Sequence, residues 1–151
     1  MQIHAPHATT SADSRSTASA RYTWRTGLIS AATALAGNAV VLLTARSAGA
    51  DMLVRRELSE PAMAIGMGTV AAMTLGPILL GTLVLLVVRR WGVRAWRTLA
   101  VIGLVLGVVT APAPFTVLAG TSTQVGLALM HLVTGLAWFA VLRRAATRPG
   151  A

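Results

Sequence analysis

The sequence contains no cysteine and very little charge. The absence of cysteine excludes disulfides, thiolate metal sites and cysteine nucleophiles. Only 11% of the 151 residues are charged, whereas a soluble domain carries roughly 25%. No Walker A loop, HExxH pair or Rossmann glycine pattern occurs. With three histidines and four acidic residues in all, we predict a protein that is not an enzyme, with no catalytic residue, metal site or cofactor.

Hydrophobic residues make up 55% of the sequence and cluster in four long runs. At about 1.5 Å of rise per residue, each run is close to the length that crosses a hydrocarbon core of about 30 Å as a helix. We therefore predict four spans, at residues 27–45, 63–88, 99–119 and 125–142. Pro77 predicts a kink in the second span, and Pro112 and Pro114 interrupt the third.

These spans predict an all-α fold, an integral membrane four-helix transmembrane bundle over residues 26–145. Residues 1–25 are rich in serine, threonine and alanine and lack an apolar period, so we predict a disordered N-terminal tail. Residues 146–151 form a short C-terminal tail.

A cleaved signal peptide is the rival interpretation of the first run, because Ala48, Gly49 and Ala50 resemble a cleavage site. The length of the run and the position of Arg46 favour a retained helix instead.

All 13 cationic residues are arginines, and the net charge is +9. They flank the apolar runs, which is typical of membrane topology and not of a nucleic-acid-binding face. With the N-terminus inside, ten arginines fall in inner segments and three, Arg46, Arg55 and Arg56, in outer loops. This excess predicts that both termini are cytoplasmic. Trp91 and Trp96 lie among the inner arginines and are expected to anchor that loop at the membrane surface, or to form an anionic-lipid site.

Polar groups are predicted to gather at one level in the outer half of the bundle. His131 is the only ionisable side chain well inside a span, which makes it a functional candidate by default. Asn38 and Thr110 lie at a similar predicted depth. Asp51 follows the first span, in a loop predicted as a short interfacial helix or a solvated segment, and could close over this level. We predict that Asn38 and His131 face the interior near each other, as interhelical hydrogen bonding or as a small-ligand or proton site.

Small residues recur at four-residue spacing in the middle spans. Gly68 and Gly76 belong to one such stripe, and Gly103 and Gly107 to another. Small side chains let helices approach closely within a membrane. We expect these glycines to pack helices within the chain, with a homo-oligomer interface as the alternative.

Four segments between residues 28 and 144 carry a resemblance. They are GADMLV after the first run, RAWRTLAVI, VVTAPAP and TSTQVGLALMHLV. In their order and spacing the chain resembles a group of small, uncharacterised four-helix membrane proteins common in actinobacteria, a domain of unknown function. The resemblance implies four spans, a bacterial plasma membrane and a retained first helix. It implies no known activity and no catalytic residue.

The favoured function is that of a non-enzymatic accessory or assembly protein. Its expected partners are the lipid bilayer and either further copies of itself or another membrane protein, and no nucleic acid. The alternative is a small transporter or channel subunit that uses the polar site around His131.

Overall fold

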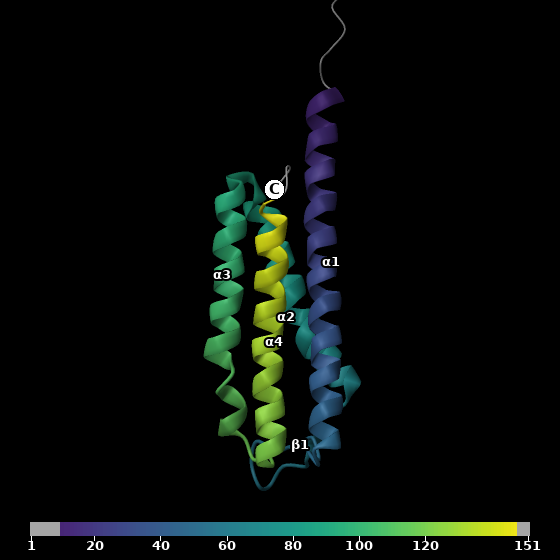
Figure 1. Cartoon of the computed structure of the whole chain (residues 1–151), viewed down its shortest axis with the longest axis vertical. Helices are drawn as coiled ribbons and strands as arrows, with labels where there is room; N and C mark the ends of the chain where they lie inside the picture. Colours follow the sequence, from purple (N-terminus) through teal and green to yellow (C-terminus); the bar gives the residue numbers. More distant parts are fainter. Residues whose placement is uncertain (1–9, 148–151) are drawn as a thin grey trace, which may run out of the picture.

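The fold comes from a computed structural model that describes the backbone of residues 10–147 and the side chains from residue 20 onward. Four long helices stand side by side, and both ends of the described chain lie at one end of the bundle (Figure 1). The elements in chain order are α1 (Thr10–Ser47), β1 (Leu53–Val54), β2 (Met63–Ala64), α2 (Met67–Val88), η1 (Arg89–Trp91), α3 (Val93–Thr110), η2 (Ala113–Thr116) and α4 (Thr121–Ala145). Four helical segments are long and apolar enough to cross a membrane. The predicted all-α membrane bundle is therefore confirmed.

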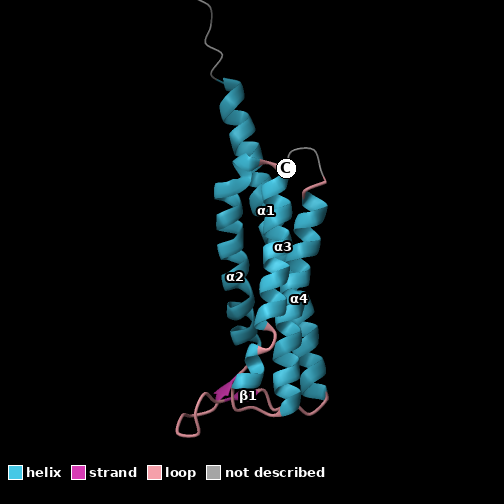
Figure 2. Ribbon diagram, turned by 90° about the vertical axis from the view of Figure 1, so that its left-hand side faces the viewer, coloured by secondary structure: helices cyan, strands magenta, loops and turns pink. Residues whose placement is uncertain are grey.

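Helix α1 begins earlier than the sequence predicted. It starts at Thr10, before the first predicted span, and residues 1–9 and 148–151 lie outside the described residues. Alanine and arginine, two strong helix formers, recur in this segment. The segment also only extends a helix that the apolar span has already nucleated, which avoids the cost of a new nucleus. As a result α1 extends beyond the ends of the other helices (Figure 2).

The end of α1 is a Schellman motif. Gly49 has a φ of 85°, in the left-handed region that glycine adopts without penalty. Its N–H donates to the carbonyl of Arg46 at 3.0 Å, and the N–H of Ala50 donates to that of Ala45 at 2.9 Å. The small residues that resemble a cleavage site thus form the C-terminal cap of a helix.

The loop between α1 and α2 contains a short hairpin and not the predicted interfacial helix. Strands β1 and β2 pair antiparallel, so residues 63–64 belong to this loop and α2 begins only at Met67. The loop turns apolar side chains inward and buries Met52, Val54 and Ile65 at this end of the bundle. Burying these side chains against the helix ends gives the loop a packed core that a helix lying on the membrane surface would lack.

Prolines act differently in the second and third spans. Helix α3 ends at Thr110, and the 3₁₀ turn η2 continues the span past Pro112 and Pro114, as the sequence predicted. A proline has no N–H to donate and disfavours the α conformation of the residue before it. Helix α2 instead continues through Pro77.

The apolar core divides into two clusters along the bundle axis. The cluster near the termini includes Leu85, Trp96, Trp138 and Leu142. The cluster near the α1–α2 loop includes Leu42, Met52, Val70 and Met130.

The tryptophans of the α2–α3 connection have opposite environments. Trp91 is 64% exposed, as a membrane anchor requires, but Trp96 is 1% exposed. The ring of Trp96 packs against Tyr22 at a centroid distance of 5.6 Å, and the Tyr22 hydroxyl donates to the carbonyl of Ala145 at 3.0 Å. The predicted anchoring role therefore does not hold for Trp96, which joins α1, α3 and α4 in the core.

Candidate binding pocket

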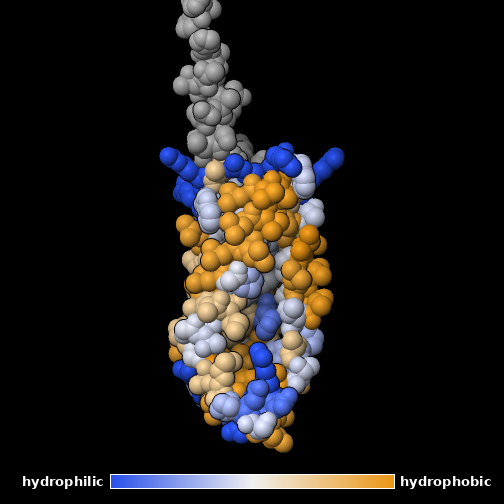
Figure 3. Space-filling model, turned by 180° about the vertical axis from the view of Figure 1, so that it is seen from behind, coloured by the Kyte–Doolittle hydropathy of each residue, from blue (hydrophilic) through white to orange (hydrophobic). Residues whose placement is uncertain are grey.

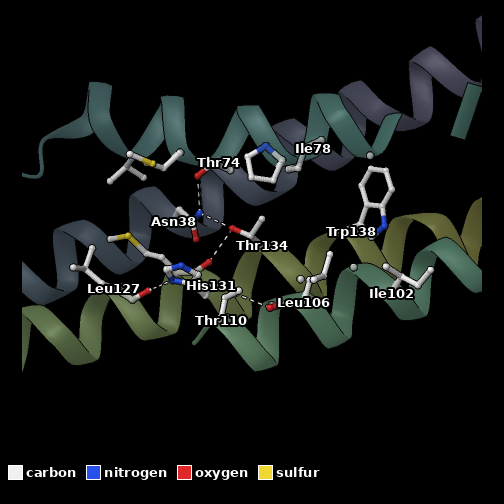
Figure 4. A pocket seen from close by; sticks show the side chains of 18 of the residues that line it. Asn38, Thr74, Ile78, Ile102, Leu106, Thr110, Leu127, His131, Thr134 and Trp138 are labelled. Carbon is white, nitrogen blue, oxygen red and sulfur yellow. Dashed lines mark hydrogen bonds between the residues drawn. The ribbon is translucent and has the colours of Figure 1, made fainter. Parts of the chain in front are cut away.

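A polar layer separates the two apolar clusters. On each of three helices a polar residue stands one turn from a core residue on either side: Ala34, Asn38 and Leu42 on α1, Val70, Thr74 and Ile78 on α2, and Met130, Thr134 and Trp138 on α4. The Nδ2 atom of Asn38 donates to Oγ1 of Thr74 at 2.8 Å and to Oγ1 of Thr134 at 2.9 Å (Figure 4). One carboxamide therefore joins α1, α2 and α4.

The hydrogen bonds fix which way the Asn38 carboxamide points. Thr134 already donates its hydroxyl proton to the Met130 carbonyl at 2.8 Å, so it can only accept from Asn38, and the atom facing it must be nitrogen. The Asn38 oxygen then has no hydrogen-bond partner among the described residues, although Asn38 is only 2% exposed. Most buried polar atoms are paired, so this one indicates either a missing partner or a cost that the fold tolerates.

His131 supplies the second polar group at this level. Its Nδ1 lies 2.8 Å from the carbonyl oxygen of Leu127, one turn earlier in α4. Because a carbonyl can only accept, Nδ1 carries the proton, and in the neutral ring Nε2 keeps its lone pair. The Asn38 oxygen lies on the side of the carboxamide that faces the His131 ring (Figure 4). Two acceptor atoms, Oδ1 of Asn38 and Nε2 of His131, thus lie in the same part of the bundle interior.

Asn38 and His131 line a pocket of about 590 Å³ that extends between α2 and α3. Helix α1 packs closely against α2 and α4, and α3 against α4, but α2 and α3 make few contacts with each other. The space-filling view shows a hollow on the rear face, with hydrophilic atoms inside it and apolar atoms around it (Figure 3). The exposed side chains of Met73, Ile102 and Leu106 are among the lining residues.

Both ends of the pocket are covered. Toward the termini, the indole of Trp138 lies between Gly81 of α2 and Gly103 of α3, and its Nε1 donates to the Leu99 carbonyl at 2.9 Å. Toward the other end, the α1–α2 loop buries Met52 and Ile65. The side between α2 and α3 is therefore the open approach to the pocket.

The structure brings together most of the predicted polar site. Asn38, Thr110 and His131 all line the pocket, but Asn38 nitrogen bonds to threonines and not to His131. Asp51 is not among the lining residues. Its Oδ1 accepts from the Thr123 hydroxyl at 2.9 Å, so it joins the loop to the start of α4 and does not close over His131.

The electrostatics of Asp51 reflect this role in the loop. The backbone N–H of Leu53 and the hydroxyl of Thr123 donate to its carboxylate and hold the pKa of Asp51 below its ordinary value. In the part of the chain that the structure describes, no three histidine, aspartate or glutamate side chains come together in a way that could hold a metal ion. The pocket is thus suited to binding through hydrogen bonds and apolar contact.

Two of the four glycines predicted to pack helices do so. A Cβ at Gly107 would lie 2.8 Å from the His131 carbonyl oxygen and 2.9 Å from the Gly135 Cα, and a Cβ at Gly103 would overlap the Trp138 indole. By contrast, nothing lies within 4 Å of a Cβ at Gly68 or Gly76. These two therefore do not pack against another helix of the chain, and the alternative of an interface between copies stays a prediction for them.

The sequence reasoning missed the packing face of α1. Its buried residues recur every four positions and are small or polar over most of the length: Thr26, Ser30, Ala34, Asn38 and Leu42. The glycines Gly27 and Gly37 of the same helix would meet Thr82 and Val133 if they carried a Cβ. The four-residue spacing was the signal that could have identified this face.

Comparison with known families gives one match. Residues 18–148 match the family of unknown function DUF6069. The chain belongs to DUF6069. The match to DUF6069 covers all four candidate spans and confirms the resemblance to an uncharacterised domain family. Neither the curated proteins nor the solved structures that were compared contain a match.

Proposed function

We propose that this member of DUF6069 is a non-enzymatic membrane protein that binds a small molecule from the apolar phase of the bilayer, in the pocket between α2 and α3. The observation that carries the proposal is the open side of that pocket. Its rim carries exposed apolar side chains, including Met73, Ile102 and Leu106, which suit contact with acyl chains. A molecule dissolved in the bilayer would reach the pocket without crossing water.

The volume and the walls of the pocket support the same function. A volume of about 590 Å³ falls within the range of small-molecule sites, which are mostly apolar with a few polar groups that orient the ligand. Most lining residues are apolar, and Asn38, His131 and four threonines are the polar ones. The sequence favours an accessory role, and the pocket suggests what that role is. We propose that the protein binds a molecule of the bilayer without changing it chemically.

Transport or ion conduction, the alternative from the sequence, has less support. It requires a continuous polar path, but the indole of Trp138 lies between α2 and α3 on the side toward the termini. Beyond it the cluster around Leu85, Trp96 and Leu142 is apolar and buried. A single chain in this conformation would therefore hold a ligand and not pass one.

The proposal includes an orientation in a bacterial plasma membrane, with the termini in the cytoplasm. Eight arginines with described side chains belong to the segments at the termini end: Arg21, Arg25, Arg89, Arg90, Arg94, Arg97, Arg143 and Arg144. Three belong to the α1–α2 segment at the opposite end, Arg46, Arg55 and Arg56. Cytoplasmic segments carry the excess of arginine and lysine.

Quenching of tryptophan fluorescence by 1-bromohexane tests the binding function. Replacing the exposed Trp24 and Trp91 with phenylalanine leaves Trp96, which is 1% exposed, and Trp138, which lines the pocket. In this background we expect 1-bromohexane to quench Trp138 with a saturable dependence on its concentration in the membrane.

A matched pair of variants locates that binding. Ile102→Phe adds bulk to a lining residue that is 45% exposed, whereas Val101→Phe adds the same ring to a neighbour that is 47% exposed and outside the lining. We expect Ile102→Phe to raise the half-saturating concentration about fivefold or more and Val101→Phe to leave it unchanged. Quenching that does not saturate, or that both variants affect equally, would overturn the proposed function.

A further inference from the structure

Beside the hydroxyls of Thr69 and Thr74, the pocket presents two free acceptors, on Asn38 and His131. Asn38 has already donated both Nδ2 protons, and Thr110 and Thr134 donate their hydroxyl protons to carbonyls of their own helices. The buried Asn38 oxygen has no partner among the described residues, and the His131 tautomer with its proton on Nδ1 has a lone pair on Nε2. A ligand that matches this site must therefore bring a hydrogen-bond donor.

The donor must also be uncharged. No described lining residue is an aspartate, a glutamate or an arginine. A cationic head group would thus lie in apolar surroundings without a counter-ion, and an anionic one would face the lone pairs of Asn38 and His131. A hydroxyl is the smallest uncharged group that supplies a donor, and its single proton can be shared between two neighbouring acceptors.

The position of the acceptors places the head group deep in the bundle. Asn38 lies nine residues before the end of α1 at Ser47, and His131 lies ten residues after the start of α4 at Thr121. At 1.5 Å per residue both are about 14–15 Å from the same end of the bundle. The rest of the pocket, from this layer to Trp138, is mostly lined by apolar side chains.

We infer that the ligand is an uncharged molecule with an apolar body and a hydroxyl head, and that Asn38 Oδ1 and His131 Nε2 share the single hydroxyl proton in a three-centre hydrogen bond. This rests on the proposed function, because it specifies what the same pocket binds. The chemistry is shared by long-chain alcohols, acylglycerols and phenols of the bilayer. The juxtaposition of a buried, unpartnered carboxamide oxygen with a histidine that has used its Nδ1 proton is the feature that selects this class.

A matched pair of probes tests the inference. The first is 1-bromohexane, and the second is 6-bromohexan-1-ol, which adds a hydroxyl at the end opposite the bromine. His131 and Trp138 are seven residues apart on α4, about 10 Å along the helix, so a six-carbon chain held at the acceptor pair carries its bromine toward the indole. Trp138 fluorescence is measured in the background without Trp24 and Trp91.

Variants of the two acceptors are compared with a control on the same helix. Asn38→Ala removes the buried oxygen, and His131→Leu removes the Nε2 lone pair. Thr33→Ala is the control, because Thr33 lies on α1, is exposed, bonds only to the carbonyl of Ile29 and does not line the pocket. Each probe is compared between wild type and variant, so that differences in partitioning into the membrane cancel.

We expect Asn38→Ala and His131→Leu each to raise the half-saturating concentration of 6-bromohexan-1-ol about threefold or more, because each removes one acceptor of the shared hydrogen bond. The values for 1-bromohexane, and those of Thr33→Ala with either probe, should stay within twofold of the wild type. If Asn38→Ala does not fold, the half-saturating concentrations measured for His131→Leu test the inference alone.

The two possible failures can be told apart. Equal effects of the variants on both probes, or no effect on either, would overturn the hydroxyl inference while saturable quenching by 1-bromohexane still supports a bilayer-facing pocket. Absence of saturable quenching by either probe would overturn the proposed function itself.

Discussion

At the scale of single residues, Asn38 is a costly choice for the centre of a membrane bundle. An apolar residue would continue the packing between Ala34 and Leu42, both of which are fully buried. Asn38 joins three helices through two hydrogen bonds, each worth about 0.6–2 kcal/mol within a membrane. Its unpartnered oxygen costs about 1–3 kcal/mol. The net gain in stability is therefore small, which favours a binding role for the residue.

The glycines of α2 and α3 give a residue-scale prediction about stability. Gly107→Ala would place a Cβ against the α4 backbone at His131 and Gly135, which cannot move aside as a flexible side chain can. We expect a loss of about 1–3 kcal/mol and a lower midpoint of thermal unfolding in detergent. Gly76→Ala is the matched control, because its Cβ meets nothing within 4 Å and alanine is the better helix former by roughly 0.8–1.0 kcal/mol. Equal midpoints for the two variants would show that α3 and α4 are not in backbone contact.

At the scale of elements, the α1–α2 loop is held by bonds to several partners. The Thr123 hydroxyl at the start of α4 donates to Asp51 and accepts from the N–H of Met52 at 3.2 Å. Arg55 exchanges two backbone hydrogen bonds of 2.9 Å with Leu118. These bonds connect the loop to the segment that leads from η2 into α4, so the loop and the start of α4 should move as one unit.

The carboxylate of Asp51 makes this unit sensitive to acid. Its pKa in the folded chain is lowered by the Leu53 N–H and the Thr123 hydroxyl, so its contribution to stability is fully present above the unfolded pKa of about 3.9. The contribution is lost as the pH falls through the lower folded pKa. We expect Asp51→Asn to lower the unfolding midpoint at pH 7, and the gap from the wild type to close below pH 4.

A nearby carboxylate provides the control for that measurement. Glu57→Gln alters the same loop but removes neither of the bonds to Asp51. The unfolding midpoint of Glu57→Gln should equal that of the wild type both at pH 7 and below pH 4. A gap between Asp51→Asn and the wild type that does not narrow as the pH falls below 4 would show that the loop does not depend on the ionised carboxylate.

Some of these elements could be predicted from the sequence and others could not. Four spans could be predicted because a bilayer demands long apolar helices, and Pro112 and Pro114 locate the break after α3 by their missing N–H groups. The hairpin could not be predicted, since strands of two residues carry no usable alternation and form only against the buried side chains of Met52 and Val54. Trp96 was placed at the interface because its partner Tyr22 is distant in the sequence.

At the scale of the whole molecule, the candidate site was partly predictable. Asn38, His131 and Thr110 lie at similar depths on three helices, and polar groups avoid lipid. These two facts together predicted that the three residues share one site. The pocket itself depends on how far α2 stands from α3, which follows from the rotation and tilt of whole helices. Sequence spacing does not fix those quantities, and for the same reason it did not show that Gly68 and Gly76 face no other helix of the chain.

The orientation of the molecule gives the last prediction. Both ends of the described chain lie at the end of the bundle where most arginines gather (Figure 1). Gly120 precedes α4 and lies at the other end. Because arginine-rich short loops stay in the cytoplasm, reporter fusions in a bacterial host should give a periplasmic signal at Gly120 and a cytoplasmic one at the C-terminus.

Whether the arginines determine this orientation can be tested separately from the orientation itself. Replacing Arg89, Arg90, Arg94 and Arg97 with alanine removes the charge of the α2–α3 connection, and we expect a mixed or inverted topology, since the bias of basic residues sets orientation. Replacing Arg46, Arg55 and Arg56 at the opposite end should only strengthen the original orientation. The same sidedness at Gly120 and the C-terminus would mean that α4 does not cross the membrane. Opposite sidedness that ignores both sets of substitutions would mean that another feature, such as the extension of α1 beyond the bundle, determines how the chain inserts.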